Sequence, residues 1–321
     1  MNVERMNEVH LGEISTLWNR ELGEAFPMRL RLLRQNIAQD RNWLREGSWV
    51  ALEPGTNRVI GFVIAKIARA DAVRAGIPQG LGWLQALLVD SAHRGRGVGR
   101  ALLLRAEAAL REVGATRIQL GNDLHSRIFP GVPEELGEAR AWFERQGYAY
   151  QDTVHDLLLA YAAEDAVSLP AAPGATFRVA EPADRDALHA FMARCFPGAW
   201  AYQHRDYWER GGTGRELVVL ERDGAIVGFC RMNDSASPLL AQNIYWTPLF
   251  DEELGGIGPL GIDESCRGLK YGISIVQAAI HYLRERGVRR IVIDTTPFVD
   301  FYGKLGYRTW KSYAKYAKAL E

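Results

Sequence analysis

The apolar positions between residues 84 and 120 predict a strand, a loop, a helix and a second strand. The run LQALLV (84–89) is short, apolar and followed by a glycine-rich stretch, which predicts a buried strand. RIQL (117–120) has the composition of another strand. Between them, residues 99–113 predict an amphipathic helix. Its apolar stripe consists of Ala101, Leu102, Leu104, Ala108, Leu110 and Val113.

The same succession occurs a second time in the chain. Three pairs of stretches correspond, in the same order, in the two halves. They are NRVIGFVIAKI (57–67) with GAIVGFCRMN (224–233), SAHRGRGVGRALLLRAEAALREVGATRIQL (91–120) with ESCRGLKYGISIVQAAIHYLRERGVRRIVI (264–293), and RAWFERQGYAY (140–150) with VDFYGKLGYRT (299–309). Each copy mixes strands and helices, so the chain is predicted to be a duplicated α/β domain.

The boundary between the copies is predicted in AEDAVSLPAAPGAT (163–176), which is rich in small residues, contains proline and lacks a clear amphipathic period. After it, TFRVAEPADRDALHAFMARCF restarts as a strand, a Pro-Ala-Asp helix entry and an amphipathic helix. We therefore expect an N-terminal domain at 1–162, a linker at 163–175 and a C-terminal domain at 176–321.

Composition restricts the partners. The chain has 321 residues, 47% of them apolar, and 39 basic residues balance 39 acidic ones. No overall field attracts nucleic acid or an anionic membrane, so we expect neither partner. The start, MNVERMNEVHLGE, lacks an apolar signal segment, and the cysteines are three, widely spaced and without a zinc pattern, so we expect a cytoplasmic protein without metal. A monomer and a homodimer both remain open, because the duplication already supplies paired domains.

The stretch SAHRGRGVGRALL (91–103) has the composition of a phosphate-binding loop at a helix N-terminus. A P-loop needs GxxxxGK followed by Ser or Thr, which is absent. A dinucleotide fingerprint needs a third glycine where Leu102 stands. The pattern that remains is Arg/Gln-x-x-Gly-x-Gly/Ala, which Arg94, Gly97 and Gly99 satisfy. A tight turn with solvated arginines is the alternative, but each glycine at a helix entry costs about 1 kcal/mol without a function.

These residues resemble the acyl-CoA loop of the GCN5-related N-acetyltransferase (GNAT) superfamily, and the resemblance covers nearly the whole chain as two tandem copies. It implies, in each copy, a mixed and mostly antiparallel sheet flanked by helices, with a splayed central strand. It also implies acetyl-CoA as cosubstrate, with its pyrophosphate on the loop amides and its pantetheine along the preceding strand. The implied contacts are Leu87, Leu88, Val89, Arg94, Gly95, Arg96, Gly97, Val98, Gly99 and Arg100.

The second copy departs from this pattern. In CRGLKYGIS the residues Arg267, Gly268 and Gly272 match, but Lys270 stands where the first required glycine should be. A side chain there crowds the pyrophosphate path, while its ammonium can itself bind phosphate. Either CoA binds the second copy in an altered way or the site is lost.

The family's tyrosine in FYxKxGF often gives a proton to the departing CoA thiolate. The resemblance places this role on Tyr302 of FYGKLGY, whereas Phe143 occupies the equivalent position in WFERQGY. Asp294, after the strand RIVI (290–293), is a candidate base, and Asn122 is a candidate contact of pantetheine. Packing of the tyrosine, capping by the aspartate and turn formation by the asparagine are the alternative explanations.

Two further stretches are candidates for acceptor recognition. FPGAWAYQHRDYWERGG (196–212) is dense in aromatic residues, and LHSRIFPGVPEELGE (124–138) is an insertion of the first copy. The insertion resembles tandem acetyltransferases associated with amino-sugar salvage, and the architecture is similar to that of mycothiol synthase. The expected activity is acetyl transfer from acetyl-CoA to the primary amine of a small molecule, with an amino sugar as one candidate. The alternative is a non-catalytic acyl-CoA-binding or sensor protein.

Overall fold

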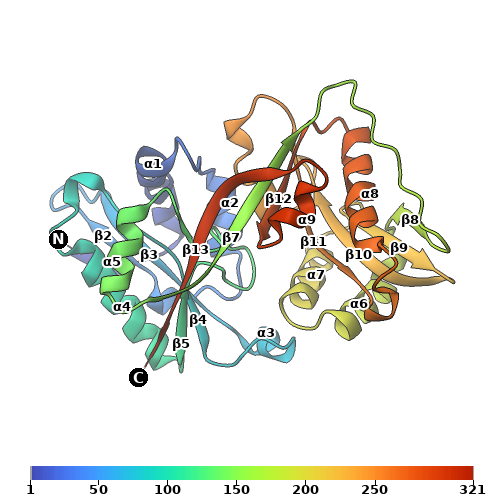
Figure 1. Ribbon diagram of the computed structural model, residues 1–321. Helices are drawn as coiled ribbons and strands as arrows, with labels where there is room; N and C mark the ends of the chain where they lie inside the picture. The colour runs from blue at the N-terminus through green and yellow to red at the C-terminus, as the bar shows by residue number, and fades with distance from the viewer. Residues whose placement is uncertain (1, 321) are drawn as a thin grey trace. The chain divides into compact units, whose positions relative to one another are not determined.

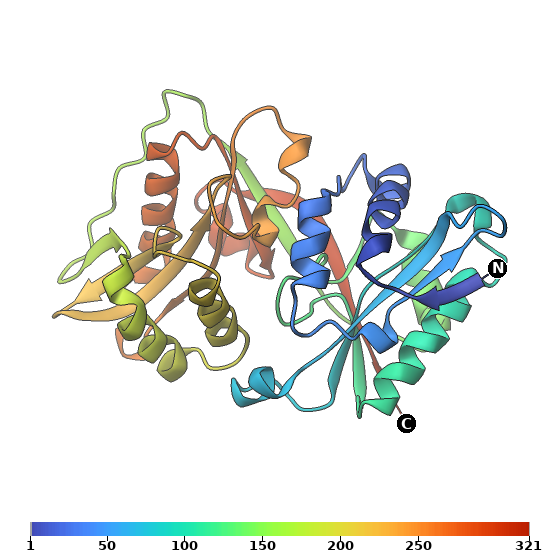
Figure 2. The same ribbon diagram turned by 180° about the vertical axis from the view of Figure 1, so that it is seen from behind.

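A computed structural model describes residues 2–320 of the chain. By its internal contacts the chain divides into two compact units. Of the described residues, 2–155 and 311–320 form unit 1, and 156–310 form unit 2. Figures 1 and 2 show the elements of both units from opposite sides.

Unit 1 is a sheet with helices on both faces. Its strands are β1 (Asn2–Arg5), β2 (Trp49–Leu52), β3 (Val59–Ile67), β4 (Leu81–Val89), β5 (Arg117–Leu120), β6 (Val132–Pro133), the first part of β7 (Ala149–Ala160) and most of β13 (Arg308–Ala319). Its α-helices are α1 (Leu11–Leu22), α2 (Leu30–Leu33), α3 (Ala70–Arg74), α4 (Val98–Glu112) and α5 (Gly137–Arg145). Four short helical turns complete it: η1 (Glu8–His10), η2 (Arg34–Ala38), η3 (Arg45–Gly47) and η4 (Ser91–His93).

The strand order in unit 1 is β1-β2-β3-β4-β5-β13-β7. Neighbours from β1 to β4 pair antiparallel, and β4 pairs parallel with β5. In Figures 1 and 2, α4 and α5 lie on one face of this sheet and α1 on the other. The predicted strands at 84–89 and 117–120 and the predicted helix at 99–113 are confirmed as β4, β5 and α4, and the repeated stretch 57–67 contains β3.

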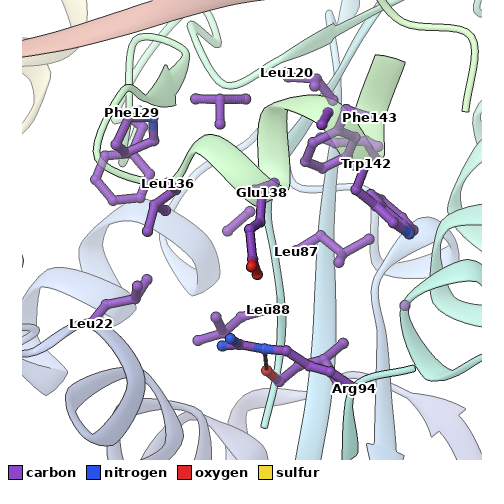
Figure 3. A pocket seen from close by; sticks show the side chains of 18 of the residues that line it. Leu22, Leu87, Leu88, Arg94, Leu120, Phe129, Leu136, Glu138, Trp142 and Phe143 are labelled. Carbon is purple, nitrogen blue, oxygen red and sulfur yellow. Dashed lines mark hydrogen bonds between the residues drawn. The ribbon is translucent and has the colours of Figure 1, made fainter. Parts of the chain in front are cut away.

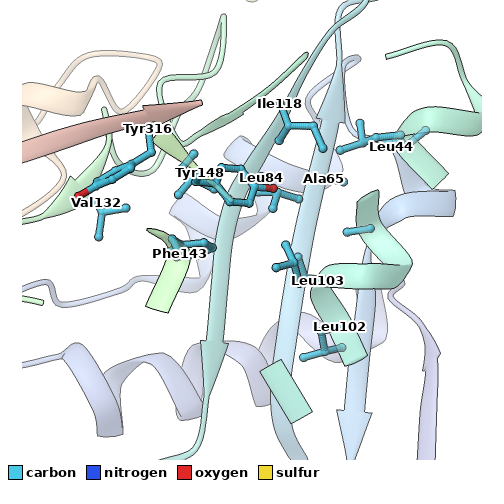
Figure 4. Close-up of a cluster of buried hydrophobic side chains, with 14 of the residues drawn as sticks. Leu44, Ala65, Leu84, Leu102, Leu103, Ile118, Val132, Phe143, Tyr148 and Tyr316 are labelled. Carbon is cyan, nitrogen blue, oxygen red and sulfur yellow. The ribbon is translucent and has the colours of Figure 1, made fainter. Parts of the chain in front are cut away.

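The alternation of side chains along β3 builds a core on each face of the sheet. Val63 points into a buried cluster with Leu102 of α4, which Figure 4 shows close up. Phe62, one residue earlier, stacks on Trp18 of α1 with 6.4 Å between ring centroids. Packing explains why position 61 is a glycine: a Cβ there would lie only 3.2 Å from side-chain carbons of Leu102 and Val98. In the Gly-Phe pair of the repeat, the glycine thus lets α4 approach one face of the sheet closely, and the phenylalanine packs against α1 on the other face.

Unit 2 repeats this plan. Its strands are the end of β7, β8 (Thr176–Val179), β9 (Leu217–Arg222), β10 (Ala225–Asn233), β11 (Leu254–Ile262) and β12 (Arg290–Thr296), in the order β7-β12-β11-β10-β9-β8. Its α-helices are α6 (Arg185–Cys195), α7 (Ala199–Glu209), α8 (Tyr271–Glu285) and α9 (Val299–Gly303). The short turns are η5 (Pro182–Asp184), η6 (Gln242–Ile244), η7 (Thr247–Leu249) and η8 (Glu264–Cys266).

Period-two alternation again divides the core of unit 2 between the two faces of its sheet. Val218 and Leu220 of β9 join the cluster that α8 covers, whereas Leu217 and Val219 join the cluster beneath α6 and α7. The strand RIVI (290–293) is confirmed as part of β12, which pairs parallel with β11.

The last strand of each copy crosses the division between the units. β7 begins in unit 1 and its residues from Asp156 onward belong to unit 2, while β13 begins in unit 2 and its residues from Lys311 onward belong to unit 1. In unit 1, β13 pairs antiparallel with β5, with Ala317 opposite Gln119. The domain boundaries at 162/163 and 175/176, inferred from the composition of residues 163–176, stay a prediction about folding units.

Candidate active site

The centre of unit 1 is a strand that separates from its neighbour. β4 and β5 pair from Leu81 and Arg117 as far as Leu84 and Leu120. The register between β3 and β4 then shifts, with Ala65 opposite Leu84 but Ile64 opposite Ala86, so that Gln85 is an extra residue in a bulge. Beyond the bulge β4 is paired with β3 alone. The splayed central strand predicted from the resemblance is therefore present.

The same geometry occurs in unit 2. β11 and β12 pair from Leu254 and Arg290 as far as Ile257 and Ile293. The register between β10 and β11 shifts at the same place, with Cys230 opposite Leu260. Both copies therefore open their sheet just before the glycine loop.

The loop after β4 exposes a row of backbone N–H groups. Gly95 and Gly97 have φ values of 73° and 82°, which glycine adopts readily, and a Cβ on either would meet nothing within 4 Å. Within the described chain, the backbone N–H groups of residues 95–100 donate to no other backbone group. Because α4 begins at Val98, these groups coincide with the positive end of the helix dipole. The loop has the geometry of an anion site.

Arg94 braces this loop rather than extending from it. Its Nε donates to the Val89 carbonyl at 3.1 Å, and its Nη2 donates to Glu21 of α1 at 2.7 Å. Glu21 also accepts from the backbone N–H and the hydroxyl of Ser91, each at 3.1 Å. Asp90 caps the turn by accepting from the Ala92 N–H at 2.9 Å. The loop is therefore held in shape by the unit's own acidic side chains.

A cavity of about 900 Å³ opens along the splayed strand. Its wall includes all of the predicted contacts on β4 and most of those on the loop: Leu87, Leu88, Val89, Arg94, Gly95, Gly97, Val98, Gly99 and Arg100. Arg96 is exposed on the same loop and does not line the cavity. Figure 3 shows apolar side chains from β4, α1 and α5 around the space, with Arg94 at one side. An apolar channel that ends on a polar loop suits a long thiol with a phosphate at one end.

The opposite wall comes from the insertion of the first copy, as expected for an ordered loop at a site. Phe129, Val132 and Leu136 of this segment line the cavity, and Glu138 projects toward its middle from the start of α5 (Figure 3). Sequence reasoning included Glu138 only as the last residue of the candidate stretch 124–138, and it missed Trp142 and Gln85 as lining residues. An acid in the first turn of a helix ordinarily signals a dipole contact, and nothing in the sequence distinguishes Glu138 from that case.

Asn122 lies just beyond the end of β5 in a left-handed turn with φ of 51°, and its backbone N–H donates to the Phe129 carbonyl at 2.8 Å. This geometry is the turn formation that an asparagine favours. Asn122 does not line the cavity, and its contact with pantetheine stays a prediction.

The loop of unit 2 keeps the backbone geometry despite its lysine. Gly268 has φ of 84°, and Lys270 takes φ of 60° at the N-terminus of α8, matching Gly95 and Gly97 of the first loop. Gly272 faces α9, with Phe301 3.9 Å from where its Cβ would lie. Arg267 pairs with Glu264 at 3.1 Å. The roles of Arg267, Gly268 and Gly272 in binding CoA stay a prediction.

Tyr302 lies on α9, buried in the cluster beneath α8, at the position equivalent to Phe143. Burial, with Cys230 and Asp294 nearby, raises its pKa above the ordinary value, so the phenol stays protonated at neutral pH. Asp294 accepts from Asn243 at 2.9 Å and from the Thr295 hydroxyl at 3.2 Å. The structure thus places the predicted acid and base near each other in unit 2, and their catalytic roles stay a prediction.

The aromatic stretch at 196–212 forms α7 and the turns on either side of it. Tyr202, His204 and Tyr207 are buried in unit 2. Tyr207 donates to Glu216 at 2.6 Å, and burial lowers the pKa of His204 to about 3, so its ring is neutral and accepts from Trp208 at 3.0 Å. These contacts are those of a packed helix.

Among residues 2–320, no helix combines the length and apolar character that a membrane span requires. No group of three or more His, Cys, Asp or Glu side chains in that part of the chain is arranged to hold a metal ion.

Comparison with known proteins accounts for both copies. The model of the acetyltransferase (GNAT) family matches residues 12–129 and again residues 185–307. Mycothiol acetyltransferase of Thermomonospora curvata is 26% identical over 82% of this chain and 79% of that protein. Mycothiol acetyltransferase of Acidothermus cellulolyticus is 30% identical over 70% of this chain and 68% of that protein.

Solved structures show the same arrangement. A GCN5-related glucosamine N-acetyltransferase region of a fungal multi-domain β-N-acetylglucosaminidase matches 98% of this chain with a TM-score of 0.86 and 26% identity, and this chain spans 38% of that protein. A tandem GNAT protein from the clavulanic acid biosynthesis pathway matches 99% of this chain with a TM-score of 0.68 and 18% identity, which shows the fold. With the splayed strand and the glycine loop present in both units, this chain belongs to the acetyltransferase (GNAT) family as a tandem N-acetyltransferase.

Proposed function

We propose that the protein transfers the acetyl group of acetyl-CoA to the primary amine of a small molecule, and that the amine belongs to an amino sugar. The observation that carries the proposal is the cavity of unit 1, which runs along the splayed end of β4 and ends on the unpaired amides of the loop at 95–100.

The residues of this cavity fit acetyl-CoA. The unpaired edge of β4 from Leu87 to Val89 offers backbone groups to the amides of pantetheine, as a strand does to a neighbour. The loop amides and the start of α4 offer donors to the pyrophosphate. Arg96 and Arg100 are exposed and add positive charge beside it.

The acceptor class is supported by the relatives. Two of them are named mycothiol acetyltransferase, and a third is described as a glucosamine N-acetyltransferase region. Glucosamine is an amino sugar with one primary amine. The insertion that walls the cavity opposite β4 supplies a surface for such an acceptor.

The chemistry needs a group that gives a proton to the thiolate of CoA. In unit 1 this position is Phe143, which lines the cavity and carries no proton to give, so a water must serve there. In unit 2 the equivalent is Tyr302, which we propose as the acid if that unit performs the transfer, with Asp294 as base.

A thiol-release assay tests the proposal. Purified protein is mixed with acetyl-CoA and a panel of primary amines that includes glucosamine, with N-acetylglucosamine and glucose as matched controls without the amine. We expect release of CoA with glucosamine or another amine and background release with both controls.

The second candidate function is that of a non-catalytic acyl-CoA-binding protein. It is favoured by position 143 of the cavity, where phenylalanine offers no proton to the thiolate. Calorimetry with CoA distinguishes the two functions. Tight binding of CoA without amine-dependent thiol release would support the second candidate and contradict the first.

A further inference from the structure

The bulge in β4 carries a buried glutamine whose side chain is fixed but only half satisfied. Gln85 is 2% exposed and lines the cavity at the point where β4 leaves β5. Its Nε2 donates to the carbonyls of Ser126 at 2.8 Å and Asn36 at 3.3 Å. Within residues 2–320 its Oε1 accepts from no group. A buried acceptor without a donor destabilises the fold, so we expect a partner for this oxygen.

The surroundings hold this glutamine in place. Lys66 of β3 is fully buried and donates to Asp123 at 2.8 Å and to Asp40 at 2.7 Å. The same ammonium lies 3.3 Å from the Ser126 carbonyl that receives Gln85. These bonds hold the insertion against β3 and β4. A rotation of the Gln85 amide would break both hydrogen bonds that its Nε2 donates.

The unsatisfied groups of this cluster are acceptors. Besides Gln85 Oε1, the second oxygen of Asp123 is buried without a partner in the described chain. Asp123 and Asp40 share the single ammonium of Lys66, and Arg127 is the further cation that acts on Asp123. Lys66 and Arg127 supply two positive charges for the two carboxylates, so the cluster lacks donors for two buried oxygen atoms rather than a further cation.

From this geometry we propose that Gln85 Oε1 accepts a hydrogen bond from the amine of the acceptor substrate in the cavity of unit 1. This inference rests on the proposed function and adds the contact that selects an amine. Gln85 is the residue that touches the acceptor, and Lys66 is a positioning residue that acts through the insertion. An acceptor without an N–H at this point leaves the buried oxygen unpaired, which is how such sites reject analogues.

Gln85→Met tests the contact, because methionine has a similar length and offers no strong acceptor. We expect KM for the amine to rise about 10- to 100-fold, the range for losing a hydrogen bond to a charged group. The dissociation constant of acetyl-CoA should stay within twofold of the wild-type value. Gln119→Met is the matched control, since Gln119 lies on neighbouring β5, accepts from Trp83 at 3.1 Å and does not line the cavity.

Gln119→Met should lower the melting temperature without changing KM for the amine. A Gln85→Met enzyme with an unchanged KM for the amine, or with weakened acetyl-CoA binding instead, overturns the proposed contact. If methionine prevents folding, the wild-type protein supplies the second test: glucosamine should bind at least about tenfold more tightly than 2-deoxyglucose, which has no donor at the carbon that bears the amine in glucosamine, and equal affinity in calorimetry overturns the contact. A wild-type enzyme that turns over no amine overturns the proposed function and this contact together.

Discussion

Gly97 and Lys270 show how one backbone conformation is used by two different residues. Both have positive φ, 82° and 60°, at the first position before a helix. Glycine adopts it freely, whereas a residue with a Cβ pays about 1–2 kcal/mol. Unit 2 therefore keeps a strained backbone at Lys270. The two loops share this backbone conformation although their sequences differ at this position.

Gly97→Val should weaken CoA binding tenfold or more, which corresponds to about 1.4 kcal/mol. A β-branched side chain resists the left-handed conformation and intrudes on the path of the pyrophosphate. Calorimetric titration with CoA measures the effect. Gly114→Val is the control, because Gly114 has φ of 84° near the opposite end of α4, away from the cavity. Equal CoA affinity in the two variants would remove the loop at 95–100 from the binding site.

Tyr302→Phe should lower kcat by about 10²–10⁴-fold, with a much smaller change in KM, if unit 2 performs the transfer. The substitution removes one hydroxyl and little volume, so folding should survive. Tyr271→Phe serves as the control: Tyr271 is another buried tyrosine of unit 2, and its hydroxyl donates to the Pro173 carbonyl at 2.6 Å. If kcat of Tyr302→Phe stays within twofold of wild type while Gly97→Val abolishes turnover, the acid assignment is wrong and unit 1 performs the transfer.

At the scale of elements, the glycine loop depends on α1 as much as on β4 and α4. Glu21 near the end of α1 has a side chain that is only 6% exposed, and it holds Ser91 and Arg94 through three hydrogen bonds. Local pattern predicted β4, the loop and α4, because each has its own period or composition. It did not predict Glu21, Gln85 or Lys66, because their partners are distant along the chain and a lone charged or amide residue carries no local signal.

Glu21→Ala should weaken CoA binding about threefold to tenfold, because the loop then samples conformations whose N–H groups do not converge. The ion pair with Arg94 contributes little by itself, since Arg94 is half exposed, and the bonds to Ser91 carry most of the effect. Calorimetry and thermal denaturation of the same samples measure it. Glu13→Ala on α1 is the control on the same helix, since Glu13 is exposed. An unchanged CoA affinity for Glu21→Ala would show that the loop keeps its shape without α1.

At the scale of the whole molecule, the duplication was visible in the sequence but the course of the final strands was not. RAWFERQGYAY and VDFYGKLGYRT are equivalent stretches, and the strands that follow them, β7 and β13, carry similar patterns. Either could complete the sheet of its own copy by local pattern alone. The contacts instead place residues 311–320 in unit 1, where Tyr316 joins the buried cluster and Lys318 pairs with Glu107 at 2.9 Å. Long-range pairing of this kind has no signature in periodicity.

Mild proteolysis should cut first within residues 163–176, as expected for a stretch of small residues with proline. Cleavage there should not separate the two fragments, because β13 from the second fragment pairs with β5 and β6 of the first. We expect two bands in a denaturing gel and a single peak at the intact mass in size-exclusion chromatography. A chain ending at residue 310 is the control, and it should melt at a lower temperature because unit 1 loses a strand of its sheet. Separate elution of the two fragments would contradict the assignment of residues 311–320 to unit 1. A first cut within residues 124–138, instead of 163–176, would identify the insertion as the more mobile segment.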